Sequence, residues 1–214
     1  MDDLQILPRF RGTMVHDFWA PYFRYPGSHA LCNAHLLREL KGITENYHQN
    51  WSEQMYDLIL EMKKAVDTAQ EQSLPLSQQL ISDFEVRYRH IIVTGILENP
   101  APEPVDYFVK RGRKKQSKAK NLLDRCQKYE TEILSFMHDF SIPFSNNLAE
   151  RDIRMMKLQQ KISGTFRSED GADWFCRVRG YISTVKKNEL PVFASLLKVF
   201  EGEPFIPAAA HRTG

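Results

Sequence analysis

The sequence predicts a mainly helical protein with a small β part. Apolar side chains recur at helical spacing from His35 onward, whereas only two short runs near the N-terminus have the character of strands. A chain of 214 residues with 42% hydrophobic content can bury one sizeable core and carry an appended subdomain. The net charge of +2 by itself says little about partners.

Two short strands are expected first. Gly12–His16 is apolar and β-branched and ends at Asp17, and His29–Asn33 is the second run. Their spacing predicts neighbouring strands of one sheet, arranged in parallel. The segment between them, Phe18–Tyr25, is densely aromatic. Trp19, Tyr22, Phe23 and Tyr25 are candidates for stacking on unpaired bases, although packing is favoured for most of them.

The rest of the chain has helical periodicity. From about Pro191 through Phe200 we expect a last helix. The fourth of the earlier helices is expected to be long and to stop before Pro143. The apolar positions are, for the first helix, Leu36, Leu37, Leu40 and Ile43; for the second, Met55, Leu58, Ile59, Met62 and Val66; for the third, Leu80, Phe84, Tyr88, Ile91 and Ile92; for the fourth, Leu122, Leu123, Cys126, Tyr129, Ile133, Phe136 and Met137; and, for a later helix, Trp174, Phe175, Val178, Tyr181, Ile182 and Val185.

Cysteine usage and hydropathy limit the class of protein. Three widely spaced cysteines argue against a disulfide framework and for a reducing compartment. No apolar run is long enough to cross a bilayer and no leader is evident, so we expect a soluble cytoplasmic protein. Cys126 and Cys176 fall in apolar stripes and are expected in the core. Cys32 and His35 are spaced for a metal site, but a second pair of zinc ligands is missing.

The most informative segment is a helix that opens at Asn147. One face carries Asn147, Glu150, Arg151, Arg154 and Lys157, and Asp152 is the one charge among the apolar residues of the other face. A carboxylate framed by cations suits a divalent metal beside a phosphate backbone. A capping box between Asn147 and Glu150 explains the same residues without any function. The helix alone leaves both interpretations open.

Further cations are candidates for phosphate contacts. A run from Lys110 to Lys120, which includes Lys114 and Lys115, contains no acidic residue. A solvated linker is the favoured interpretation of this run, because Pro-rich residues 99–104 precede it. Arg167, Arg177 and Arg179 could contact phosphates, and surface solvation accounts for them equally well.

Several stretches together carry a family resemblance. They are Arg9–Asp17, His29–Leu40, Asn146–Arg154 and Lys161–Ser168 with the following Gly171-Ala172. In this order, and over nearly the whole chain, the sequence resembles the transposases of the insertion sequence 66 family.

The resemblance implies a DDE-type recombinase built on a ribonuclease H-like sheet. Asp17 matches the second catalytic aspartate and Glu150 the catalytic glutamate, and both would hold a pair of Mg²⁺ ions, with Mn²⁺ as a substitute. The implied partner is double-stranded DNA at insertion-sequence terminal repeats, bound by a homodimer or larger assembly. The expected DNA contacts are Asn147, Arg151, Arg154, Lys157, Lys114, Lys115 and Arg167.

The domain organisation follows from this resemblance. We expect a partial ribonuclease H-like sheet in residues 1–34, a helical insertion in 35–145 with a basic linker near 110–120, the catalytic glutamate helix and C-terminal helices in 146–200, and a tail in 201–214. The fold is therefore expected to be an incomplete ribonuclease H-like α/β domain of two strands with a large helical insertion.

The first catalytic aspartate of the family is not matched. Asp2 and Asp3 lie too close to Asp17, in what resembles the end of a helix rather than an opening strand. We therefore expect a truncated fragment that lacks the upstream strands and cannot transpose DNA alone. The alternative is a non-catalytic helical remnant that binds DNA or a protein partner, with Glu150 acting only as a helix cap.

Overall fold

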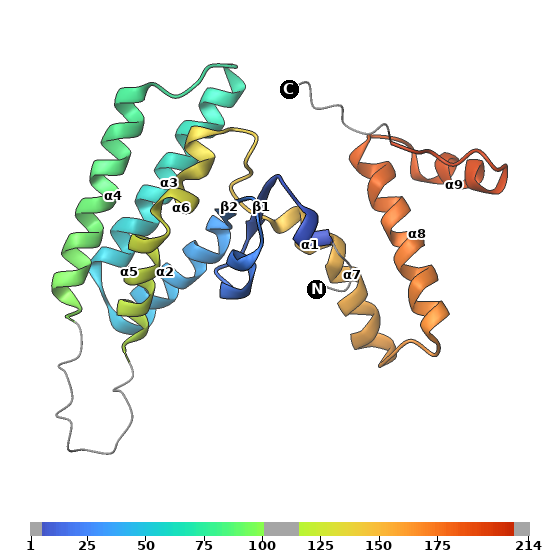
Figure 1. The fold of residues 1–214 in the computed structure, drawn as a ribbon, viewed down its shortest axis with the longest axis horizontal. Coiled ribbons are helices and arrows are strands. Elements are labelled where there is room, and N and C mark those ends of the chain that lie inside the picture. The colour runs from blue at the N-terminus through green and yellow to red at the C-terminus, as the bar shows by residue number, and fades with distance from the viewer. Residues whose placement is uncertain (1–5, 101–115, 208–214) are drawn as a thin grey trace, which may run out of the picture. The chain divides into compact units, whose positions relative to one another are not determined.

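The computed structural model describes residues 6–100 and 116–207. The chain divides into two compact units, residues 1–146 and residues 147–214, and each is described separately. Figure 1 shows the order of the elements along the chain. Of the N-terminal segment expected to be a helix end, the structure describes only α1 (Ile6–Arg9), and Asp2 and Asp3 lie outside the described residues.

The first unit contains a two-stranded parallel sheet, as predicted. β1 (Thr13–His16) pairs with β2 (Ser28–Leu31) in a register that sets Thr13 opposite Ser28 and His16 opposite Leu31. The amide of Cys32 donates a further hydrogen bond of 2.8 Å to the carbonyl of His16. A short 3₁₀ helix, η1 (Ala20–Arg24), lies in the connection between the strands. Both strands therefore end at the same edge of the sheet.

Five helices form the bulk of this unit. They are α2 (Asn33–Tyr47), α3 (Asn50–Glu71), α4 (Gln78–Glu98), α5 (Lys118–Lys128) and α6 (Glu130–His138). α3 packs against both α2 and α4, and α3 and α4 run antiparallel (Figure 1). Serine caps the starts of α4 and α5, since the Ser77 hydroxyl accepts from the Leu80 amide and the Ser117 hydroxyl from the Lys120 amide. The described part of the chain is thus mainly helical, as expected.

The prediction of one long fourth helix is wrong, because this segment forms two helices, α5 and α6, which are separated at Tyr129. This residue has φ −115° and ψ 32°, outside the helical region. Its ring stacks on Phe23 at a centroid distance of 4.4 Å and meets the edge of Phe18 at 6.4 Å. The apolar stripe continues through the break, so the 3.6-residue periodicity gave no sign of it.

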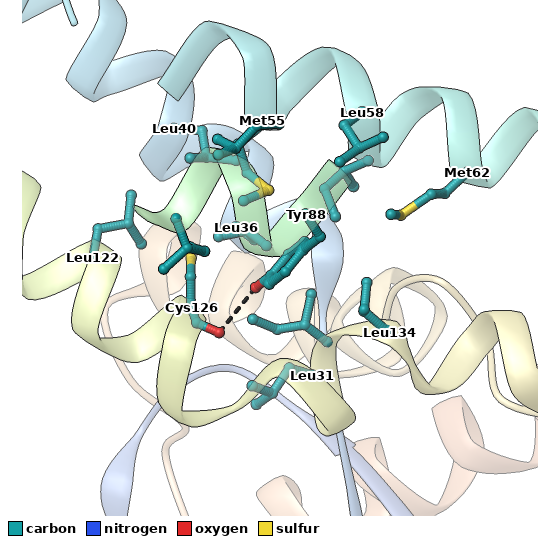
Figure 2. Packing of buried hydrophobic residues seen from close by; sticks show 14 of the residues in the cluster. Leu31, Leu36, Leu40, Met55, Leu58, Met62, Tyr88, Leu122, Cys126 and Leu134 are labelled. Carbon is teal, nitrogen blue, oxygen red and sulfur yellow. Dashed lines mark hydrogen bonds between the residues drawn. The ribbon is translucent and has the colours of Figure 1, made fainter. Parts of the chain in front are cut away.

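One hydrophobic core joins the helices to the sheet (Figure 2). Leu31 of β2 lies in the same cluster as Leu36, Met55 and Leu122. Tyr88 is fully buried among these side chains, and its hydroxyl donates a hydrogen bond of 2.9 Å to the carbonyl of Cys126. The prediction that Cys126 belongs to the core is confirmed.

The second unit consists of α7 (Asn147–Ser163), α8 (Glu169–Lys187) and α9 (Val192–Phe200). α8 packs against both α7 and α9. The hydroxyl of Tyr181 donates a 3.1 Å hydrogen bond to the carbonyl of Ser195 and accepts one from the amide of Phe205. Within residues 147–207, only Val185 and Ser195 are buried.

The placement of Cys176 in a core was wrong. Its side chain is exposed, as are those of Trp174 and Val178 on the same helix. The apolar stripe of α8 has a clear helical period, but only Val185 of it is buried, while Phe175, Tyr181 and Ile182 are partly buried. Periodicity identifies the face that is apolar and does not say how much of it is covered.

Candidate functional site

Asp17 lies directly after β1, at the carboxyl edge of the sheet. Its side chain is partly buried, and its Oδ1 accepts a hydrogen bond of 3.1 Å from the amide of Trp19. This contact turns the chain from the strand into η1 and orients the carboxylate. Trp19 itself is 51% exposed, whereas Tyr25 is buried and Phe23 packs on the core, so packing is confirmed for those two aromatics.

The side chain of His16 is buried, and Asp17 is the more exposed of the two neighbours. The His16 Nδ1 is hydrogen-bonded to the main-chain carbonyl of Asp17. Its Nε2 lies 3.0 Å from His29 Nδ1, and His29 Nε2 lies 3.2 Å from the carbonyl of Tyr25. Burial lowers the pKa of His16 below its ordinary value. His16 therefore packs inside the unit, and its ring holds the main chain at Asp17.

The end of the first unit is tied to the same edge of the sheet. The amide of Asn33 donates to the carbonyl of Phe144 at 3.0 Å, and the amide of Asn146 donates to Cys32 Sγ at 3.4 Å. The buried Asn33 side chain also donates to the carbonyl of Ile133. Cys32 thus has a structural contact just after β2, and His35 lies in the first turn of α2. Asn146 and Asp17 are consequently both fixed at the strand ends.

Glu150 lies in the first turn of α7, in the second unit. It is partly buried, whereas the other polar residues of the predicted face, Asn147, Arg151, Arg154 and Lys157, are exposed. The helix predicted from Asn147 onward is confirmed over seventeen residues. Arg167 is exposed in the connection before α8. Lys114 and Lys115 lie outside the described residues.

Asp152, the one charge on the apolar side of α7, has its partners on α8. Its Oδ1 accepts a hydrogen bond of 2.6 Å from the Ser183 hydroxyl, and its Oδ2 pairs with Lys187 Nζ at 2.5 Å. These contacts, that of Lys187 first, lower the pKa of the Asp152 carboxyl. Sequence reasoning noticed the odd carboxylate but not its partner, which lies 35 residues further along the chain.

A groove between α7 and α8 was also missed. Its volume is about 560 Å³. Its lining includes several cations from both helices, namely Arg151, Arg154, Arg179, Lys186 and Lys187. The basic character of α8 could have indicated this groove, but only Arg177 and Arg179 of that helix were named as candidate phosphate contacts.

A carboxylate fixed at a strand end and a helix rich in exposed cations are features suited to a protein that handles metal ions and nucleic acid phosphates. The family model described as Transposase IS66 family matches residues 3–174. The chain therefore belongs to the IS66 family of transposases. No significant match was found among curated proteins or among solved structures.

Membership in this family implies an enzyme of DNA transposition and an interaction with DNA. Within the described ranges, none of the helices combines the length and the apolar character that crossing a membrane requires.

Proposed function

We propose that Asp17 and Glu150 are two carboxylates of a DDE-type catalytic site, which cleaves and transfers DNA strands at the ends of an insertion sequence. The observation that carries this proposal is the position of Asp17. It follows a partly buried parallel strand, and a main-chain amide orients its carboxylate at the sheet edge where both strands end.

The anchoring of Asn146 supports the pairing of these two residues. Asn146 is hydrogen-bonded to Cys32, one residue beyond β2, and Leu31 of β2 is the register partner of His16. Glu150 follows Asn146 by four residues, and chain connectivity keeps their Cα atoms within about 15 Å of each other. This short connection supports the assignment of Glu150 and Asp17 to one site.

The chemistry of the donor set fits magnesium. Carboxylate oxygens are the hard ligands that Mg²⁺ prefers, with Mn²⁺ as a substitute. An ionised carboxylate has about four acceptor positions, so the bond from the Trp19 amide leaves Asp17 with capacity for a metal. When bound, a pair of such ions activates a water or 3′-hydroxyl nucleophile and stabilises the leaving oxygen of the phosphodiester. Asp17 and Glu150 would hold them.

The family pattern requires a third carboxylate. Neither β1 nor β2 contains an aspartate, and Asp17 follows the first of them. We assign the first aspartate of the triad to a further strand of a ribonuclease H-like sheet, beside the two ligands Asp17 and Glu150.

The DNA would lie along the polar face of α7. Arg151, Arg154 and Lys157 are exposed and offer charge to the phosphates, with Asn147 and Arg167 beside them. Lys114 and Lys115 are assigned the same role from the sequence alone. The substrate is double-stranded DNA at the terminal repeats, held by a homodimer or larger synaptic assembly.

Metal-directed cleavage of the polypeptide tests the carboxylate pair without requiring transposition. Fe²⁺ bound in place of Mg²⁺, with ascorbate and peroxide, cuts the backbone next to its ligands. We expect cuts adjacent to Asp17 and to Glu150 that excess Mg²⁺ suppresses and that Asp17→Asn or Glu150→Gln removes. Asp170→Asn, on the exposed first turn of α8, is the matched control.

Cuts at only one of the two positions would reject the shared site. In a preparation that is active on insertion-sequence ends, Asp17→Ala and Glu150→Ala should each abolish cleavage with the fold retained, as judged by circular dichroism. Retained cleavage in either variant would reject that assignment. A loss of helix stability alone on Glu150→Ala would favour a capping role for this residue.

A further inference from the structure

The groove between α7 and α8 lies within the second unit and has two walls of similar charge. The α7 wall carries Arg151 and Arg154, and the α8 wall carries Arg179 and Lys186. Met155, Met156 and Ile182 are among the apolar residues of its lining. Two basic walls over an apolar floor focus a positive potential into the groove.

Among the described residues, a single carboxylate lines this groove, and it already forms an ion pair with a lysine. Asp152 pairs with Lys187 across the groove and accepts a second hydrogen bond from Ser183. The pair cancels its own charge and fixes α7 against α8. The four remaining cations therefore exceed the acids in the lining, and the ligand that suits them carries repeated negative charge.

The spacing of these cations matches a polymer of phosphates. Arg179 and Lys186 are seven residues apart on α8, which is about 10 Å along a helix axis. Arg151 and Arg154 are one turn apart on α7, about 4.5 Å. A DNA strand carries a phosphate about every 3.4 Å along its axis, so a short stretch of backbone meets several of these cations at once.

We propose that this groove binds the phosphodiester backbone of DNA, with Arg179 and Lys186 of α8 as phosphate contacts opposite Arg151 and Arg154. The proposal rests on the DNA-binding part of the proposed function and extends it to a second helix. It adds no chemical step, because these residues position the strand and do not touch the reacting atoms.

Arg177 provides the discriminating comparison. It lies on α8 only two residues before Arg179, but two residues rotate a helix position by about 200°, and Arg177 does not line the groove. It is exposed, whereas Arg179 is partly buried. The sequence alone does not distinguish these two arginines, whereas in the structure only Arg179 lines the groove.

The first experiment measures binding of the full chain to a fluorescent DNA duplex in EDTA, over a range of salt concentrations. The groove variant is Arg179→Gln with Lys186→Gln. The control is Arg177→Gln with Lys198→Gln, which removes the same charge from exposed positions outside the groove. We expect the plot of log K against log salt to become shallower in the groove variant, with the magnitude of its negative slope reduced by about two, and to change little in the control. Equal losses in both variants, or no binding by the wild type, would overturn the proposal.

A second measurement uses the wild-type chain and avoids any folding defect of the variants. Acetylation of lysines, read by mass spectrometry, should slow at Lys186 when the duplex is added and continue at Lys198. Unchanged acetylation of Lys186 in the presence of bound DNA would overturn the assignment.

The two proposals fail in different ways. Binding in EDTA does not depend on metal held by Asp17 and Glu150, so a groove that binds DNA survives even if those carboxylates prove non-catalytic. Conversely, metal-directed cuts at Asp17 and Glu150 together with an indifferent groove would retain the catalytic site and reject only the role of α8.

Discussion

The hydroxyl of Tyr88 and the main-chain carbonyl of Cys126 form a hydrogen bond of 2.9 Å inside the apolar core, joining α4 to α5 (Figure 2). Burial keeps the pKa of Tyr88 well above its ordinary value, so the phenol remains a donor through neutral pH. Tyr88→Phe should lower the free energy of unfolding by about 1–2 kcal/mol, because a buried carbonyl loses a partner. Urea denaturation measures this, and Tyr47→Phe, at a half-exposed position, should change it by less than about 0.5 kcal/mol.

Gly95 of α4 is required by the close approach of its neighbours. A Cβ at this position would lie 2.6 Å from Leu123 Cδ2 and 2.9 Å from Trp51 Cγ, both from fully buried side chains. Gly95→Ala should therefore destabilise the protein by about 1–3 kcal/mol, despite the better helix propensity of alanine.

Gly42 of α2 is the matched control for this substitution, since a Cβ there meets nothing within 4 Å. Gly42→Ala should stabilise the chain by about 0.5–1 kcal/mol. Thermal melts of the two variants should shift in opposite directions, and a shift in the same direction would contradict the packing at Gly95.

The three thiols should differ in reactivity. Burial raises the pKa of the Cys126 thiol to about 12, and Cys32 is also buried, whereas Cys176 is exposed. At pH 8 a disulfide reagent should modify Cys176 rapidly and the two others only after urea is added. Peptide mapping of the modified protein identifies the sites. Fast modification of Cys126 in the native chain would show that α5 does not stay packed.

The Asp152–Lys187 pair should give a pH-dependent contribution to stability. The folded pKa of Asp152 is lower than the unfolded value near 3.8, so its contribution is complete above that value and disappears as the pH falls through both. Because the pair is partly exposed, we expect about 0.5 kcal/mol. Asp152→Asn retains an acceptor for Ser183 and should cost this amount at pH 6 and nothing near pH 2, as measured by urea unfolding. A cost that is the same at both pH values would assign the effect to packing.

Local periodicity predicted the helical class, both strands and the start of α7, because each depends on residues close together in the sequence. It did not predict the break at Tyr129, a residue that stacks on Phe23, more than 100 residues earlier in the sequence. Nor could it pair Asp152 with Lys187. Exposure of Cys176 depends on what covers α8, and a helical stripe carries no information about that.

The candidate site likewise contains features that the sequence predicted and features that only the structure shows. The position of Asp17 at a strand end and of Glu150 in a first helical turn followed from the sequence. The bond from the Trp19 amide and the histidine chain at His16 required the structure, because their geometry arises from the turn between the strands.

Cys32 and Asn146 are 114 residues apart along the chain, yet a main-chain amide joins them. The segment from α2 to α6 is thus a long insertion whose two ends meet at the contact between Cys32 and Asn146. The cost of closing such an insertion grows only slowly with its length. Helical turns could therefore be gained or lost far from this contact while the hydrogen bond between Asn146 and Cys32 stays in place.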